Sequence, residues 1–99
     1  MSPPRKSPAH KPPDGPTPED LKPIVKRELK RLGAKLRAAR HAKGLSQEQA
    51  AELIGIHPKY MPRLESGGAN PTVSTLVAAS VAYGVPVREF FTAQDEEKA

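Results

Sequence analysis

Glycine breaks divide most of this chain into short segments with helical spacing. Apolar residues recur every three or four positions, and successive runs end at Gly44, Gly55, Gly67-Gly68 and Gly84. No segment alternates apolar and polar residues with the period of two that indicates a half-buried strand. The pattern therefore predicts five helices that form one compact all-α domain.

The individual helices can be placed from their apolar positions and their start signals. The first carries its apolar seam at Val25, Leu29, Leu32, Leu36 and Ala39. It starts either near Thr17 or at Pro23, because proline is favoured in a first helical turn. Ser46 and Gln49 fit a capping box for the second helix, which points Ala50, Leu53 and Ile54 inward. The third is expected over residues 58–66 with His57 as its N-cap, the fourth starts near Asn70-Pro71-Thr72, and the fifth spans residues 86–92.

Proline content separates the N-terminal region from this helical part. Eight of the 12 prolines fall within the first 23 residues, among side chains that are almost all polar or charged. Such a segment cannot bury enough apolar surface to offset the entropy of ordering it. We therefore predict a disordered, proline-rich basic arm over residues 1–22, a folded domain over residues 23–93 and an acidic tail over residues 94–99.

The net charge of +5 is concentrated in one stretch of the chain. Residues 24–44 hold eight basic side chains and one acidic side chain, whereas residues 45–67 hold two basic and three acidic ones. A basic stripe of this kind is typical of a phosphate-binding surface. Taken alone, it is explained equally well by a solvated helix face.

Composition excludes several classes of function. The chain has no cysteine, which removes disulfides, thiolate zinc sites and cysteine nucleophiles. Its three histidines, His10, His41 and His57, are too scattered for a metal site. No nucleophile–base set, carboxylate pair or phosphate loop is recognisable, so we expect no enzymatic activity, metal, cofactor or small-molecule ligand. No apolar run reaches the roughly 18 residues of a membrane helix, and no signal peptide is seen. A cytoplasmic, nucleoid-associated location is expected.

The most specific signal is a pair of short helices between residues 47 and 64. A tight turn at Gly55-Ile56-His57 joins them, and glycine suits a turn position that needs positive φ. Ala51 is small where the two helices must cross closely. The seam between them is expected at Ile54, Ile56, Met61 and Leu64.

This stretch and its surroundings resemble the lambda-repressor-like family, the Xre/Cro type of helix-turn-helix regulator. The resemblance covers about residues 30–92 and is most specific for the short stand-alone members, such as restriction–modification controller proteins. It is carried by Leu32-Gly33, Leu36-Arg37, Arg40, residues 44–51, Gly55-Ile56-His57, Tyr60, residues 64–67, Asn70-Pro71-Thr72, Leu76, Gly84-Val85 and Phe91.

The resemblance implies a sequence-specific, DNA-binding transcriptional regulator, expected to be a repressor or autoregulator. It would bind double-stranded DNA as a homodimer and insert residues 58–66 into the major groove. Two readings from other classes stay open. One is an antitoxin-type or other protein-interaction module on the same helical domain, and the other is a basic amphipathic helix over residues 24–43 that binds membranes or RNA.

Each site residue follows from its position in this motif. Because Met61 and Leu64 occupy the inner side of the third helix, Pro58, Lys59, Pro62 and Arg63 are left to face base edges. Family positions and the following loop imply phosphate contacts at Ser46, Gln47, His57, Tyr60, Ser66, Gly68 and Asn70. The family also implies a partly buried ion pair between Arg40 and Glu65. An exposed apolar patch, and with it the dimer surface, is predicted at Val77, Val81, Val87 and Phe90.

Two features depart from the family pattern. With His57 as N-cap, Pro62 would be the fifth helical residue, where it forfeits a backbone hydrogen bond and predicts a kinked or 3₁₀-like first turn. The first helix also extends one to two turns upstream of the usual start. Whether this extension and the arm contact DNA stays open.

Overall fold

The computed structural model describes residues 15 and 17–92, and within them the fold is entirely helical. Its elements are α1 (Pro18–Ala42), α2 (Gln47–Ile54), α3 (Tyr60–Ser66), α4 (Val73–Tyr83) and the 3₁₀-helix η2 (Val87–Phe91). The all-α class is confirmed, but the described residues form four α-helices rather than five. The last segment is a single short 3₁₀ stretch, opened by Pro86, whose carbonyl accepts from the Glu89 amide three residues later at 3.0 Å.

The first helix starts at the earlier of the two expected positions. Thr17 is its N-cap, and Thr17 and Asp20 form a reciprocal capping box with bonds of 3.1 and 3.0 Å. Residues 18–22 are therefore helical and do not belong to the predicted arm, and Pro23 lies inside α1. The rest of that arm, residues 1–14 and 16, and the predicted tail lie outside the described residues.

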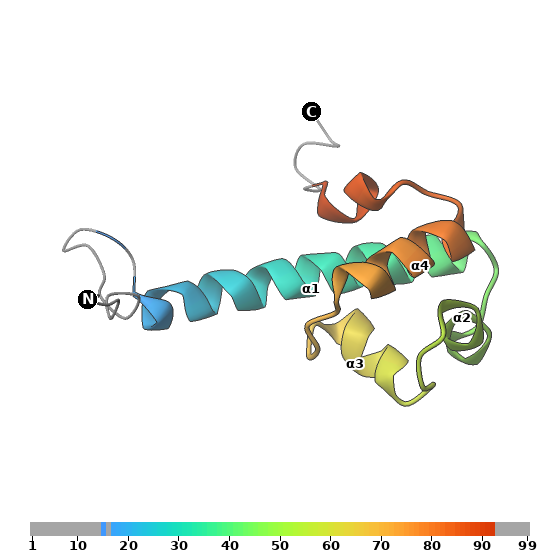
Figure 1. The fold of residues 1–99 in the computed structure, drawn as a ribbon, viewed down its shortest axis with the longest axis horizontal. Coiled ribbons are helices and arrows are strands. Elements are labelled where there is room, and N and C mark those ends of the chain that lie inside the picture. The colour runs from blue at the N-terminus through green and yellow to red at the C-terminus, as the bar shows by residue number, and fades with distance from the viewer. Residues whose placement is uncertain (1–14, 16, 93–99) are drawn as a thin grey trace, which may run out of the picture.

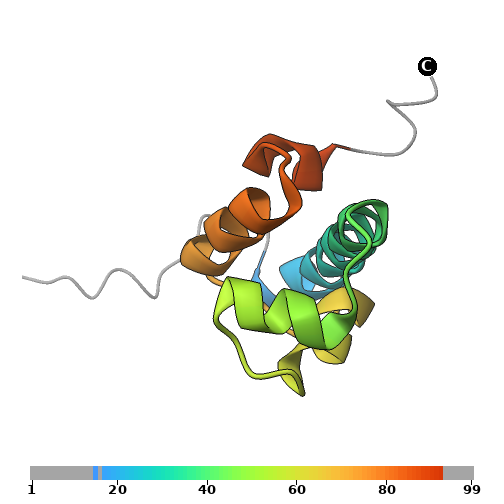
Figure 2. The same cartoon turned by 90° about the vertical axis from the view of Figure 1, so that its right-hand side faces the viewer.

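The core lies around the C-terminal half of α1. In Figure 1, α3 lies below this helix and η2 above it, and Figure 2 looks along α1 with α2 and α3 at the bottom. The largest side chains that are fully buried there are Phe90, Leu36, Met61 and Leu64. Two residues expected to point inward do not: Val25 is 45% exposed and Leu53 is 59% exposed. Val25 lies in the part of α1 that projects beyond the other helices, and Leu53 lies on the outer face of α2.

A glycine sets how closely α3 approaches α1. A β-carbon added at Gly33 would lie 2.5 Å from the carbonyl oxygen of Glu65 and 2.6 Å from that of Leu64. The backbone at the end of α3 therefore packs directly on the backbone of α1, which leaves no room for any side chain at this position. The residue pattern alone assigned Gly33 no such role.

The end of α3 packs on α1, and the start of α3 is positioned by the turn that joins it to α2. Gly55 has φ of +88°, and its amide donates to Ala51, which is completely buried at the helix crossing. His57 was expected to be the N-cap of α3, but Lys59 occupies that position. Its Nδ1 accepts a hydrogen bond from the Lys59 amide at 3.0 Å, so it stabilises the turn that precedes α3.

The third helix begins two residues later than the sequence suggests, and this changes the position of Pro62. The His57 and Pro58 carbonyls accept from the amides of Tyr60 and Met61, in a 3₁₀-like entry to α3. Pro62 is consequently the third helical residue, where a missing N–H costs no intrahelical bond. The expected penalty does not arise, because the helix start has moved to accommodate both prolines.

Candidate nucleic-acid interface

One side of α3 and the turn before it is exposed. Pro58, Lys59, Pro62 and Arg63, the residues expected to face base edges, are all exposed there, whereas Met61 and Leu64 on the inner side are buried. The structure therefore places the four candidates on the outside of the helix pair. Lys59 belongs to the turn and the other cation, Arg63, to the helix.

Arg63 is tied to the loop that follows its own helix. Its Nη2 donates to the carbonyl oxygen of Gly68 at 3.1 Å, in an exposed position. The amide of Gly68 in turn donates to the Arg63 carbonyl oxygen at 2.8 Å. The Gly68 N–H therefore closes the end of α3, and a phosphate contact at Gly68 stays a prediction.

The other phosphate candidates are spread over the two ends of the helix pair. Ser46 caps α2 in a reciprocal capping box with Gln49, and the Ser66 hydroxyl donates to the Arg63 carbonyl oxygen at 3.2 Å. Tyr60 is half-buried at the start of α3, and Asn70 is exposed after the turn that ends it. Of the whole set, only Gln47 and Ser66 line the same shallow hollow.

That hollow contains a cation that the sequence analysis did not single out as a DNA contact. Arg37 lines it together with Gln47, Pro62 and Ser66, and the Arg40–Glu65 pair forms its base. Arg37 is exposed on α1, one helical turn before Arg40. This spacing of three residues was the available signal, because it puts Arg37 on the same face of the helix as Arg40.

The ion pair between Arg40 and Glu65 is present and almost completely buried. Arg40 Nε lies 2.7 Å from Glu65 Oε2 and Nη2 lies 3.0 Å from Oε1, with side-chain exposures of 8% and 4%. Arg40 Nη1 also donates to the Leu45 carbonyl oxygen at 2.8 Å. The hydrogen bonds to Glu65 raise the pKa of the Arg40 guanidinium. The two side chains thus join α1 to α3.

Helix α2 is attached to this ion pair through its first residue, Gln47. Gln47 Nε2 donates to Glu65 Oε1 at 3.1 Å. The Gln47 amide group is therefore oriented by the carboxylate, at the edge of the exposed side of α3. The network positions α1, α2 and α3 relative to one another at the point where a groove-binding surface would need them rigid.

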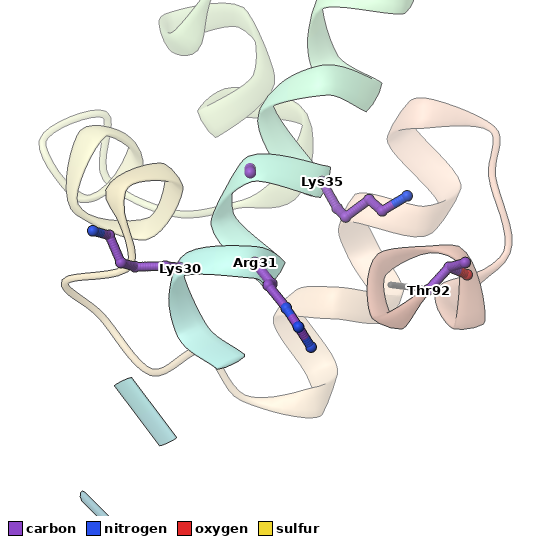
Figure 3. Close-up of a pocket in the computed structure, with 5 residues that line it drawn as sticks. Lys30, Arg31, Lys35 and Thr92 are labelled. Atoms are coloured by element: carbon purple, nitrogen blue, oxygen red, sulfur yellow. The ribbon is translucent and has the colours of Figure 1, made fainter. Parts of the chain in front are cut away.

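The basic stripe of the sequence does not form one face of the structure. Lys30 and Arg31 point in different directions from α1, and Lys35 points to the side of Thr92, at the end of η2 (Figure 3). The backbone of Lys30 lies against Gly67 in the loop after α3. Only part of the stripe therefore lies near the candidate interface.

The predicted dimer surface is partly exposed. Val77 and Val81 are 47% and 78% exposed on α4, and Val73 continues the same row at one end. Val87 is half-buried. Phe90 was wrongly expected to be at the surface: it is 2% exposed because the turn of η2 points it into the core, and its neighbour Phe91 is the exposed aromatic residue.

Two further findings concern the described part of the chain only. None of its helices is both long enough and apolar enough to cross a membrane. Residues 15 and 17–92 also contain no group of three or more histidine, aspartate or glutamate side chains that could hold a metal ion.

Comparison with known proteins identifies the arrangement of α2 and α3. A family model described as a helix-turn-helix domain matches residues 31–90, which is more than half of the chain. The chain belongs to the helix-turn-helix family. The match begins within α1 and ends in η2, so it includes the whole core. The lambda-repressor-like resemblance is confirmed.

Some relatives of this helix-turn-helix protein are matched over most of their own length, whereas the HTH-type transcriptional regulator PuuR of Escherichia coli is matched over 32% of its length. An uncharacterised HTH-type transcriptional regulator, y4dJ of Sinorhizobium fredii, is 39% identical over 67 residues, 68% of this chain and 87% of the relative. The control protein C.SmaI of Serratia marcescens is 36% identical over 63 residues, 64% of this chain and 75% of the relative. The crystal structure of the restriction–modification controller protein C.AhdI from Aeromonas hydrophila superimposes with a TM-score of 0.63 at 35% identity. It covers 66% of this chain and 98% of that protein.

Proposed function

We propose that this protein is a sequence-specific DNA-binding transcriptional regulator, which acts as a homodimer and places α3 and its preceding turn in the major groove. The observation that carries the proposal is the exposed row of Lys59, Pro62 and Arg63, on a helix whose other side is buried. A helix on an α-helical support fits the width of the major groove. The names of the relatives support a regulator rather than an enzyme.

Base reading would fall mainly to Arg63 and Lys59. The Arg63 guanidinium can donate to guanine O6 and N7 once it exchanges its exposed bond to the Gly68 carbonyl oxygen, and such a fork is worth about 1–3 kcal/mol of discrimination. Pro58 and Pro62 have no donor, so they would contribute apolar contacts, for instance to a thymine methyl group. The turn before α3 and α3 itself are nearly neutral, so few of their groups would read the base sequence.

Phosphate contacts would hold the domain in register on the duplex. Arg37, Gln47 and Ser66 lie around one hollow beside α3, and Asn70 follows in the next loop. Ser46, His57 and Tyr60 would add contacts at the starts of α2 and α3. Such contacts position a protein without reading bases, and they make its affinity depend on salt.

The second half-site would be bound by a second copy. Val77, Val81 and the half-buried Val87 are the residues that we propose to join the two copies. In a two-fold dimer of this kind the two α3 helices reach successive major grooves, about 34 Å apart. As a dimer with this spacing, the protein would repress or autoregulate by occupying a palindromic operator.

The experiment that tests this function is selection of bound sequences from random double-stranded DNA, followed by titration of variants. We expect a palindromic site, and Arg63→Ala should relax the preference at one base pair of each half-site. Arg37→Ala should weaken binding to all sequences alike. It should also reduce the slope of log affinity against log salt concentration by the amount expected for about one phosphate contact. Arg88→Ala, an exposed arginine on η2, is the matched control and should change neither. A pool without any enriched sequence would refute sequence-specific recognition.

A further inference from the structure

Three exposed cations follow the side of α1 on which α3 lies. At 100° per residue, they fall within about 60° of one another and of Gly33 on the helix: Lys26, Lys30 and Arg37. Gly33 is the residue that packs on the end of α3, so it marks the side of α1 that faces this helix. We call Lys26, Lys30 and Arg37 the cation strip.

The cation strip is continuous with the exposed side of α3. Arg37 lines the hollow beside α3 together with Pro62 and Ser66. A β-carbon added at Gly67, the next residue, would lie 2.8 Å from both Cα and Cγ of Lys30, so the stem of Lys30 crosses directly over the end of α3. Figure 3 shows the Lys30 side chain extending from α1 toward α3. The surface that we propose to enter the major groove therefore runs on into the strip.

The two lysines of the strip have no counterion in the described part of the protein. Neither Lys26 nor Lys30 forms an ion pair or a side-chain hydrogen bond with another residue there, whereas Lys22 pairs with Glu19 at 3.3 Å. The lysines are one helical turn apart, so their charges lie about 6 Å from each other along the helix axis. Like charges at this spacing repel each other, and a bound anion would relieve the repulsion.

The length of the strip indicates which anion it fits. Arg37 and Lys26 are 11 residues apart, so the strip is about 16 Å long. This length corresponds to the axial rise of roughly five base pairs. Lys26 also lies in the part of α1 that projects beyond α3 (Figure 1). The strip therefore suits a row of phosphates that continues past the groove in which α3 would lie.

We propose that Lys26 and Lys30 bind the phosphate backbone of the DNA that flanks the base pairs read by α3. The site rests on the proposed function, because α3 must lie in the groove for the strip to meet that backbone. Phosphate contacts carry no sequence information, so these lysines add affinity and register without changing which bases are preferred. The bound duplex is consequently longer than the part that α3 reads.

The salt dependence of binding tests the two contacts. Lys26→Gln/Lys30→Gln removes both charges and keeps the Cγ of Lys30 that lies over Gly67. On a long duplex of random sequence, the slope of log affinity against log salt concentration should become shallower by about 1.8, the value for two phosphate contacts. A slope equal to that of the wild type overturns the proposal.

Arg31→Gln/Arg88→Gln is the matched control, because it removes the same charge from exposed positions away from α3. Arg31 is turned about 130° from the strip on α1, and Arg88 lies on η2. This variant should keep the wild-type slope. Equal changes of slope in both double variants overturn the proposal, since they would mean that only the net charge matters. Circular dichroism should show both proteins folded.

Hydroxyl-radical footprinting on the sequence selected from the random pool locates the contacts. The wild type should protect the backbone beside the base pairs whose preference depends on Arg63. Lys26→Gln/Lys30→Gln should lose this flanking protection and keep the sequence preference. Retained flanking protection overturns the proposal. So does binding to vesicles of anionic phospholipid that depends on the two lysines while both DNA measurements stay unchanged, because the strip would then belong to a membrane surface.

Failure of the strip and failure of the proposed function give different results. A pool without an enriched sequence, combined with the expected change of slope, would refute sequence reading and leave the phosphate contacts standing. An enriched sequence combined with an unchanged slope would refute the phosphate contacts of Lys26 and Lys30 alone.

Discussion

At the scale of single residues, the buried pair of Arg40 and Glu65 dominates the energetics of the interface region. Replacement of Arg40 by methionine leaves the Glu65 carboxylate buried without its partner, so we expect a loss of about 3–5 kcal/mol in unfolding free energy. Urea denaturation measures it. The double variant Arg40→Met/Glu65→Met should regain most of this loss, because it removes both charges together.

The exposed pair of Arg31 and Glu28 is the control for this cycle. Arg31→Met should cost less than about 1 kcal/mol, since both side chains are half exposed. If Arg40→Met were equally mild, the Glu65 carboxylate would have to be reached by water in a way that its 4% exposure does not suggest.

Tyr83 gives the protein a distinct response to alkaline pH. Its hydroxyl is buried with no hydrogen-bond partner among the described residues, and burial, followed by the Glu65 charge, raises its pKa to about 12. The neutral phenol is therefore favoured in the folded state. Its contribution is complete below the unfolded pKa of 10.0 and is lost as the pH rises toward 12. The stability that the raised pKa of Tyr83 contributes, and that is lost at alkaline pH, amounts to about 2–3 kcal/mol.

The measurement is the unfolding free energy of the wild type and of Tyr83→Phe at several pH values. At neutral pH the variant should be as stable as the wild type, or more stable by about 1 kcal/mol, because an unsatisfied buried hydroxyl is removed. Between pH 10 and 12 the wild type should lose more stability than the variant. Parallel curves for the two proteins would contradict the assignment.

At the scale of elements, the contact of α1 with α3 depends on one glycine. Gly33→Ala places a methyl group 2.5 Å from a backbone oxygen of α3, and backbone cannot move aside without shifting the helix. We expect a loss of about 3 kcal/mol, with weaker DNA binding because α3 is displaced. Gly44→Ala, at φ of +76° with open space around it, should cost about 1 kcal/mol and leave DNA binding unchanged. Thermal unfolding and DNA titration of both variants compare them, and equal losses would mean that the close approach is not limiting.

The start of α3 is tested by its proline. Because Pro62 is the third residue of the helix, Pro62→Ala should change stability by less than about 1 kcal/mol. A helix starting at Pro58 would put Pro62 in its interior, and alanine would then stabilise the protein by up to about 3 kcal/mol. Chemical denaturation of Pro62→Ala and the wild type distinguishes these two starts of α3.

At the scale of the whole molecule, affinity for DNA depends on the proposed joining of two domains. Val81→Glu puts a charge at the most exposed position of the α4 row, so the proposed dimer should dissociate into folded monomers. Affinity for a palindromic site should then fall by about 10²–10⁴-fold, because binding of the second domain is no longer intramolecular. Light scattering and DNA titration measure the two effects. Ser74→Glu, also exposed on α4, is the control, and a dimer that survives Val81→Glu would exclude this surface.

Local sequence rules sufficed for much of this protein. The capping box at Ser46 and the glycine ends at Gly44, Gly55 and Gly84 predicted the second helix and the breaks, because these signals act within a few residues. The start of the first helix was left between Thr17 and Pro23, and the structure selects Thr17. The helix-turn-helix motif and its Arg40–Glu65 pair came from the family resemblance, which the fold bears out.

Tertiary packing decided the remainder, since it depends on residues far apart in the chain. The helical spacing of apolar residues predicted that Val25 and Leu53 are buried. Burial requires a neighbouring helix, however, and none of the described helices covers those positions. Phe90 and Phe91 are adjacent and equally apolar, and only the turn of η2 chooses which of them is buried. The close approach at Gly33 and the use of the Gly68 amide by α3 likewise appear only when two segments meet. The basic stripe, which the sequence explained equally well as a phosphate-binding surface or a solvated helix face, is distributed around α1 because successive residues of a helix point in different directions.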